Sequence, residues 1–228
     1  MSRLPRMGCT DSLEIIMAKT VHQAEILREY GPFDGEPPIH GVSYDGRHVW
    51  FATGGQLLAM DPASGKVVRE LKLKADAGTA CDGRHLYQIG GDVIQKIDMA
   101  SGQVVARLPL PGSGYSGLAW GEGSLWVGHW RECLILEIDP ANGAVLRTLR
   151  SDRFVTGVTW ARDQLWHGVG DGGGQGELRR VDPASGEVLE RITLPEDVAV
   201  SGLESDGASG FFCGGGRSGR LRRVKAAA

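Results

Sequence analysis

The residues of this 228-residue chain that could perform chemistry lie where apolar runs begin or end. Histidine exchanges a proton near neutral pH, and a carboxylate can act with it as a general acid or base. Aromatic rings can form the wall of a binding site, while arginine and glutamate can bind charged groups. The candidates for catalysis are His40, Asp76 and His129, and those for substrate binding are Tyr115, Trp130, Arg131 and Glu132.

These candidates occupy equivalent places in a unit that repeats along the chain. Each unit has four short apolar runs separated by turn residues, and each opens with a glycine. Successive opening glycines are 37, 39, 40 and 45 residues apart, namely Gly41, Gly78, Gly117, Gly157 and Gly202. Four strands repeating about every 40 residues are typical of a β-propeller blade. We therefore expect an all-β fold, a five-bladed β-propeller of four-stranded antiparallel blades.

The last repeat ends without a fourth strand, which would leave an open sheet edge. The segment 24–30 resembles the fourth strand of the first repeat, so we expect it to close the last blade from the N-terminal side. The whole chain, 1–228, is then one propeller domain with a flexible terminus at 1–10 and a ring-closing segment at 12–30. The expected blades are 39–73, 76–110, 115–150, 155–194 and 200–225 together with 24–30.

One aromatic position recurs in the second strand of every repeat and predicts packing between neighbouring sheets. Two cysteines, Cys81 and Cys213, are expected to be small buried residues and not nucleophiles. The ligand face of a propeller is lined by residues that enter the first strands and by loops that leave the second strands. The candidates named above are the larger polar or aromatic residues at those places. The recurring aromatic residues are Trp50, Tyr87, Trp126, Trp166 and Phe212.

Charge and composition exclude several classes of partner. The net charge is −3 and the isoelectric point is about 6.1, so no overall field attracts nucleic acid or an anionic membrane. Histidines with Asp76 or Glu132 could bind a divalent metal, but no histidine pair has ligand spacing, so we expect neither metal nor cofactor. No apolar signal segment follows Met1, which predicts a cytoplasmic protein. The sequence leaves the oligomeric state open.

Three stretches resemble the plant and bacterial glutaminyl-peptide cyclotransferases. They are Leu86-Tyr-Gln-Ile after Gly78, Leu125-Trp-x-x-x-Trp130 leading to Ile138-Asp-Pro, and Gly202-Leu with the final Leu221-x-x-Val224. The resemblance covers His40 to Val224. It implies a five-bladed propeller that cyclises N-terminal glutamine to pyroglutamate with loss of ammonia.

The residues on which that family depends are largely replaced here. Its opening glutamine corresponds to His40, its acid/base glutamate to Ala77, its asparagine to Gly128 and its lysine roughly to Gly216, whereas Trp130 is retained. The reaction needs a group that moves a proton from the amine to the leaving ammonia, and a methyl side chain cannot do so. The carboxylate of Asp76, the residue next to Ala77, is expected on the opposite face of the strand.

Three functions remain open at this point. The first is a propeller that binds, and can transform, a small molecule or peptide end at the channel mouth, with His40 as the acid or base. The second is a divergent cyclotransferase with a relocated carboxylate, Asp76 or Glu132. The third is a non-enzymatic scaffold for protein interactions, and the fold alone does not choose among them.

Overall fold

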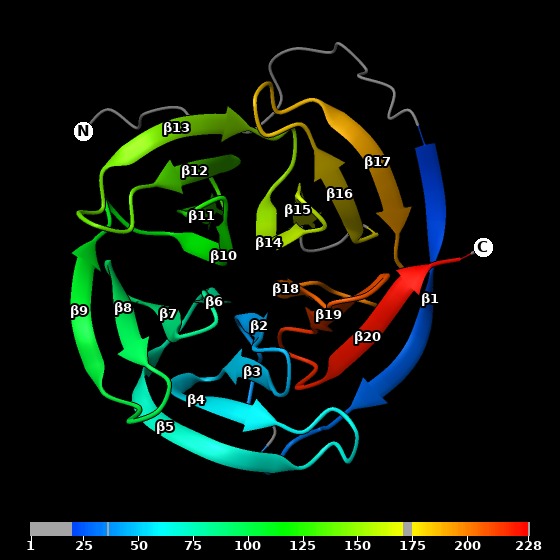
Figure 1. The fold of residues 1–228 in the computed structure, drawn as a ribbon. Coiled ribbons are helices and arrows are strands. Elements are labelled where there is room, and N and C mark those ends of the chain that lie inside the picture. Colours follow the sequence, from blue (N-terminus) through cyan, green and yellow to red (C-terminus); the bar gives the residue numbers. More distant parts are fainter. Residues whose placement is uncertain (1–19, 36, 171–174, 228) are drawn as a thin grey trace, which may run out of the picture.

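The computed structural model describes residues 20–35, 37–170 and 175–227, and within them the chain forms strands and no helix. The expected terminus 1–10 and the first part of the ring-closing segment lie outside the described residues. The strands are arranged around a centre in Figure 1, with β2, β6, β10, β14 and β18 innermost. The protein is therefore all-β, as its alternating apolar runs predict.

Three sheets each contain four consecutive antiparallel strands, from the inside of the ring outwards (Figure 1). Their short strands follow from the turn residues between apolar runs; in one turn, for example, Asp61 Oδ1 accepts a hydrogen bond of 2.8 Å from Ala63 N. The sheets comprise β2 (Val42–Tyr44), β3 (Val49–Ala52), β4 (Gly54–Met60) and β5 (Val67–Ala75); β6 (Thr79–Cys81), β7 (His85–Gly90), β8 (Val93–Asp98) and β9 (Val104–Pro109); and β10 (Tyr115–Gly121), β11 (Ser124–His129), β12 (Leu134–Ile138) and β13 (Val145–Arg150).

The fourth sheet has eight strands, in the order β14-β15-β16-β17-β1-β20-β19-β18. Hydrogen bonding thus joins the last two strand groups, whereas the sequence predicted five separate four-stranded sheets. The strands are β14 (Val155–Ala161), β15 (Gln164–Val169), β16 (Glu177–Val181), β17 (Val188–Thr193), β18 (Gly202–Ser205), β19 (Gly210–Gly214), β20 (Leu221–Ala226) and β1 (Thr20–Tyr30).

The cause of this fusion is β1, which is long enough to pair with two outer strands. Residues Ala24 to Tyr30 pair antiparallel with β20, the place that the sequence predicted for 24–30. Residues Thr20 to Gln23 continue past it and pair parallel with β17, which the sequence did not predict. One strand thereby covers two sheet edges that would otherwise expose unpaired backbone groups.

Ion pairs fasten β1 to β20. Glu29 Oε2 lies 2.8 Å from Arg222 Nε, and Glu29 Oε1 pairs with Arg220. Nearer the other end of β1, Glu25 Oε2 lies 3.2 Å from Lys225 Nζ. Since Arg222 is buried, its pairing with Glu29 is shielded from solvent more than an ordinary surface pair.

We expect Glu29→Gln to lower the free energy of unfolding by about 1 kcal/mol, because a buried guanidinium loses its counter-charge. Glu25→Gln is the matched control on the same strand, and its more exposed pair should contribute less than half as much. Urea unfolding of the two variants beside the wild type measures the difference. Equal losses would show that the contact of Glu29 with Arg222 contributes no more to the free energy of unfolding than the exposed pair of Glu25.

Five glycines bring the innermost strands together around the centre. A Cβ atom on Gly41 would lie 2.4 Å from Ala77 O, next to Gly78, and one on Gly78 would lie 2.4 Å from the carbonyl carbon of Gly117. The same overlap links Gly117 to Gly157, Gly157 to Gly202, and Gly202 back to Gly41. The contacts form a closed circuit, so the opening glycine of each repeat is required by the close approach of the next strand.

The recurrent second-strand aromatics are buried between repeats, as predicted. Tyr87 of the second repeat stacks on Trp120 of the third at 5.5 Å between ring centroids, and Trp126 stacks on Trp160 of the fourth at 5.4 Å. Phe212 of the last repeat packs against Tyr44 of the first. These contacts fill the space between adjacent sheets and fix their separation.

Candidate functional site

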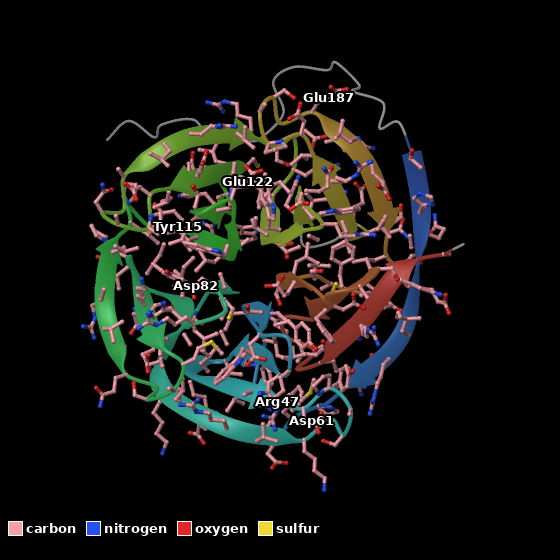
Figure 2. All side chains as sticks on the ribbon, in the orientation of Figure 1. Arg47, Asp61, Asp82, Tyr115, Glu122 and Glu187 are labelled. Atoms are coloured by element: carbon pink, nitrogen blue, oxygen red, sulfur yellow. The ribbon has the colours of Figure 1, made fainter. Side chains whose placement is uncertain are left out.

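A hollow of about 490 Å³ lies where the second strand group meets its two neighbours. Its walls come from the end of β5, the connection from β5 to β6, the β7–β8 turn and the connection from β9 to β10. Tyr115, at the start of β10, is one of its lining residues and is labelled in Figure 2. The lining residues are Lys74, Asp76, Ala77, Gly91, Asp92, Ser113, Gly114 and Tyr115.

Asp76 supplies a fixed carboxylate to this hollow. Its Oδ1 accepts a hydrogen bond of 3.0 Å from Gly91 N, and its Oδ2 lies 3.4 Å from Lys74 Nζ. Asp92 adds a second carboxylate to the lining. Two carboxylates and one ammonium give the lining a net negative charge, which favours a ligand that carries a positive group.

Tyr115 and His129 form one side of the hollow as a pair. Their strands place the two residues opposite each other, and their rings meet edge to face at 4.9 Å. The Tyr115 hydroxyl donates a hydrogen bond of 2.5 Å to Pro111 O, and burial raises its pKa. Tyr115 is therefore held as a wall and is poorly suited to release a proton.

His129 lies directly behind the hollow. Its ring is the nearest group to Gly114, whose added Cβ would lie 3.2 Å from His129 Cε1. The Nδ1 atom of His129 is buried and has no hydrogen-bond partner in the described chain. A buried polar atom without a partner costs free energy, and a role in binding or catalysis is one explanation for it.

His40 approaches Asp76 but does not line the hollow. Burial lowers the pKa of His40, and the negative charge of Asp76 opposes this shift without cancelling it. His40 is consequently a neutral imidazole at neutral pH, a form that can accept a proton. The structure thus brings Asp76 near His40 on one side and Tyr115 near His129 on the other.

The remaining candidates lie outside the lining. Trp130 is 37% exposed, packs against Phe154 at 5.4 Å, and carries the guanidinium of Arg131 over its ring at 5.2 Å. Trp130 N donates to Gly114 O, which ties its backbone to the hollow. Glu132 is exposed in the same turn. None of these three residues lines the hollow, and the described link to it is the backbone hydrogen bond of Trp130.

The positions that the sequence resemblance matched to cyclotransferase residues have the following surroundings in the structure. Ala77 lies in the hollow and is 7% exposed. At Gly128, an added Cβ would lie 2.8 Å from Val155 and 2.9 Å from Ser116, so these side chains occupy the space that an asparagine needs. Gly216 has φ of 57°, a conformation that disfavours a lysine.

Three polar residues of interest were not among the candidates predicted from the sequence. Lys74 and Asp92 belong to the hollow, and Asp92 could have been found because it lies in a loop that leaves a second strand. The third is Glu204, on the innermost strand β18. Its Oε1 accepts hydrogen bonds from Thr159 Oγ1 at 2.5 Å and Ser205 N at 2.7 Å, and its Oε2 accepts one from Ser43 Oγ at 3.2 Å.

Loss of hydration on burial raises the pKa of Glu204 to about 7, although these donors act in the opposite direction. Glu204 lies two residues beyond the ring of opening glycines, whereas His40 lies just before it. Neither Glu204 nor the groups that donate hydrogen bonds to it line the hollow, so we assign it no role there.

The described residues provide neither a cluster of metal ligands nor a helix that could span a membrane. No group of three histidine, cysteine, aspartate or glutamate side chains there could hold a metal ion. The described chain also contains no helix that is long and apolar enough to cross a bilayer.

Comparison with known proteins gives a match in structure and none in sequence. No protein-family model matches the chain, and no curated protein matches it. The crystal structure of Myxococcus xanthus glutaminyl cyclase superposes with a TM-score of 0.76 over 92% of this chain and 99% of that one. The chain has a glutaminyl-cyclase-like fold. Identity between the two is 18%, so the likeness establishes the fold and leaves the activity open.

A second similar structure is hydrazine synthase from Kuenenia stuttgartiensis. It superposes with a TM-score of 0.51 at 20% identity, over 77% of this chain. The match covers 55% of the hydrazine synthase chain. Related strand arrangements thus occur in proteins with different names, and function must be argued from the residues of the site.

Proposed function

We propose that this chain is a five-bladed β-propeller that binds a small molecule or a peptide end in the hollow between Asp76 and Tyr115. This number of blades treats the eight-stranded sheet as two blades that β1 joins. The closed circuit of five glycines supports it. The observation that carries the binding proposal is the lining itself, a fixed carboxylate facing an aromatic wall with an unpartnered histidine nitrogen behind it.

The chemistry of this lining suits a ligand with an amine and a small apolar part. Asp76 and Asp92 would attract the amine, Tyr115 would contact the apolar part, and neutral His40 near Asp76 could take up a proton. Trp130, Arg131 and Glu132 would contact only a ligand that extends beyond the hollow. Standard glutaminyl cyclisation is not part of this proposal, because Ala77 stands where the acid/base group is needed.

Ligand-induced thermal stabilisation tests the proposal, since a ligand that binds the native state raises the melting temperature. We expect at least one amine from a panel of amino acids, amines and short peptides to stabilise the wild type. Asp76→Asn should remove at least half of that shift, because the amine loses its counter-charge, and His129→Ala should weaken it through loss of the wall behind Gly114.

Asp163→Asn is the matched control, because Asp163 is an exposed turn residue. Its backbone has a left-handed conformation, which asparagine also adopts. It should keep the full shift. A panel without any stabilising amine would contradict the proposed ligand class. A shift that Asp76→Asn and His129→Ala both retain in full would place the binding site elsewhere.

A second candidate function is a divergent cyclotransferase, and the presence of Asp76 in the hollow favours it. In that case Asp76 moves the proton in place of the missing glutamate. It predicts pyroglutamate formation that depends on Asp76.

A further inference from the structure

A separate hollow lies at the seam where the last strand group meets the first. It has a volume of about 290 Å³ and shares no lining residue with the candidate site. Its walls come from β1, β2, β19, β20 and the turn that begins at Asp61, which Figure 2 labels near the end of β1. At about 30 Å³ for each water, it would hold roughly ten water molecules, comparable to one small organic acid.

This seam hollow presents positive charge. It is lined by Arg28, Arg223 and Asp206, but the Asp206 side chain is only 2% exposed while that of Arg223 is 41% exposed. Arg223 covers Asp206, with Nε at 2.8 Å and Nη2 at 2.7 Å from its Oδ2. A ligand therefore meets the guanidinium and not the carboxylate beneath it.

Arg28 is held in place by neutral groups. Its Nη1 donates to Pro62 O at 3.0 Å and Ala63 O at 2.9 Å, and its guanidinium lies 4.9 Å from the centroid of the Tyr30 ring. Within the described chain Arg28 forms no ion pair, and its Nη2 and Nε donate to no other group. A guanidinium that is oriented in advance and lacks a counter-charge is a site for an anion.

The other walls are aromatic. Phe212 and Tyr44 form a tilted pair at 5.4 Å, and Tyr30 is fixed because its hydroxyl donates to Pro62 O at 3.1 Å. Phe212 and Tyr30 are buried, so the rings do not have to be ordered when a ligand binds. Such a hollow can hold a flat ring by stacking while the arginines bind an acidic group at its edge.

We propose that the seam hollow binds a small aromatic carboxylate, with the ring against Tyr44 and Phe212 and the carboxylate at Arg28 and Arg223. Neither group alone defines the ligand. The two guanidiniums select for charge, and the aromatic pair selects against an anion without a ring. Because the hollow is built from β1 and the first strand group, an occupied site also joins the two ends of the ring.

Benzoate, benzamide and inorganic phosphate separate these contributions in a ligand-observed NMR titration of the full chain. We expect saturable benzoate binding, with benzamide and phosphate each at least tenfold weaker. Arg28→Gln should weaken benzoate binding at least tenfold. Ala63→Phe should block the hollow without altering its charge, and both substituted residues are exposed.

Asp76→Asn is the control at the other hollow, and it should leave benzoate binding unchanged. No benzoate binding by the wild type would overturn the proposal. It would also be overturned by equal binding of benzamide or phosphate, or by benzoate binding that survives both Arg28→Gln and Ala63→Phe. None of these outcomes depends on whether the candidate functional site binds an amine.

Discussion

Replacing Gly117 by alanine is expected to lower the free energy of unfolding by ~3 kcal/mol or more. The added Cβ would lie 2.3 Å from Val158 N and 2.6 Å from the carbonyl carbon of Gly157. Both atoms belong to the backbone of β14, which hydrogen bonds hold on its other side to β15. The first strands of the third and fourth repeats would have to separate, and the circuit of glycine contacts would open.

Gly55→Ala is the matched control, since no atom lies within 4 Å of its added Cβ. It should change the free energy of unfolding by no more than about 0.5 kcal/mol. Urea unfolding with a circular-dichroism readout measures both variants, and solubility reports any failure of Gly117→Ala to fold. Equal stability of the two variants would mean that the first strands do not meet as described.

The second large effect concerns the pH dependence of the free energy of unfolding. We expect Glu204 to dominate this dependence in the pH range where it titrates. The folded-state pKa of about 7 lies above the ordinary glutamate value of 4.5, because burial removes hydration from the charged form. Between these values the folded protein binds a proton that the unfolded chain has released. Stability from this group is therefore fully present below about pH 4.5 and is lost as the pH rises through 7.

Glu204→Gln should remove that loss. Relative to the wild type, the variant should gain at most roughly 3 kcal/mol between pH 4.5 and pH 8, an upper limit because the carboxyl keeps some contact with solvent. Urea unfolding at the two pH values gives the difference. Glu122→Gln, at the exposed residue labelled in Figure 2, is the control and should show the wild-type slope. A Glu204→Gln slope equal to that of the wild type would rule out this titration.

The periodic features of the fold could be predicted from the sequence because each rests on a local rule. A glycine such as Gly117 recurs where strands approach, and an aromatic such as Trp126 recurs where sheets pack. The pairing of β1 with β17 could not be predicted, because Val21 is 60% exposed and nothing in its neighbourhood encodes a partner. That pairing depends on how close two outer strands come after the ring has formed.

Several residues of the candidate site could be predicted from the sequence, but their arrangement in space could not. His40 and Tyr115 were chosen by their places in the repeat, and the sequence grouped them at one central opening. The hollow instead includes the end of β5, where Lys74 lies at a position with no repeat signature. Glu204 was missed because burial raises its pKa, and that burial depends on tertiary packing. The packing brings in Ser43 and Thr159, which are 161 and 45 residues away in the chain.

The most direct test of the central claim, that the glutaminyl-cyclase-like fold persists here without the usual acid/base group, is an assay of peptide cyclisation. The protein is incubated with a glutamine-terminated peptide, and pyroglutamate is measured by mass spectrometry beside a glutaminyl cyclase as positive control. The account predicts a rate equal to that of the peptide alone, because Ala77 carries no group that transfers a proton. Pyroglutamate formation above that rate would contradict it, and loss of that activity in Asp76→Asn would assign the reaction to the relocated carboxylate.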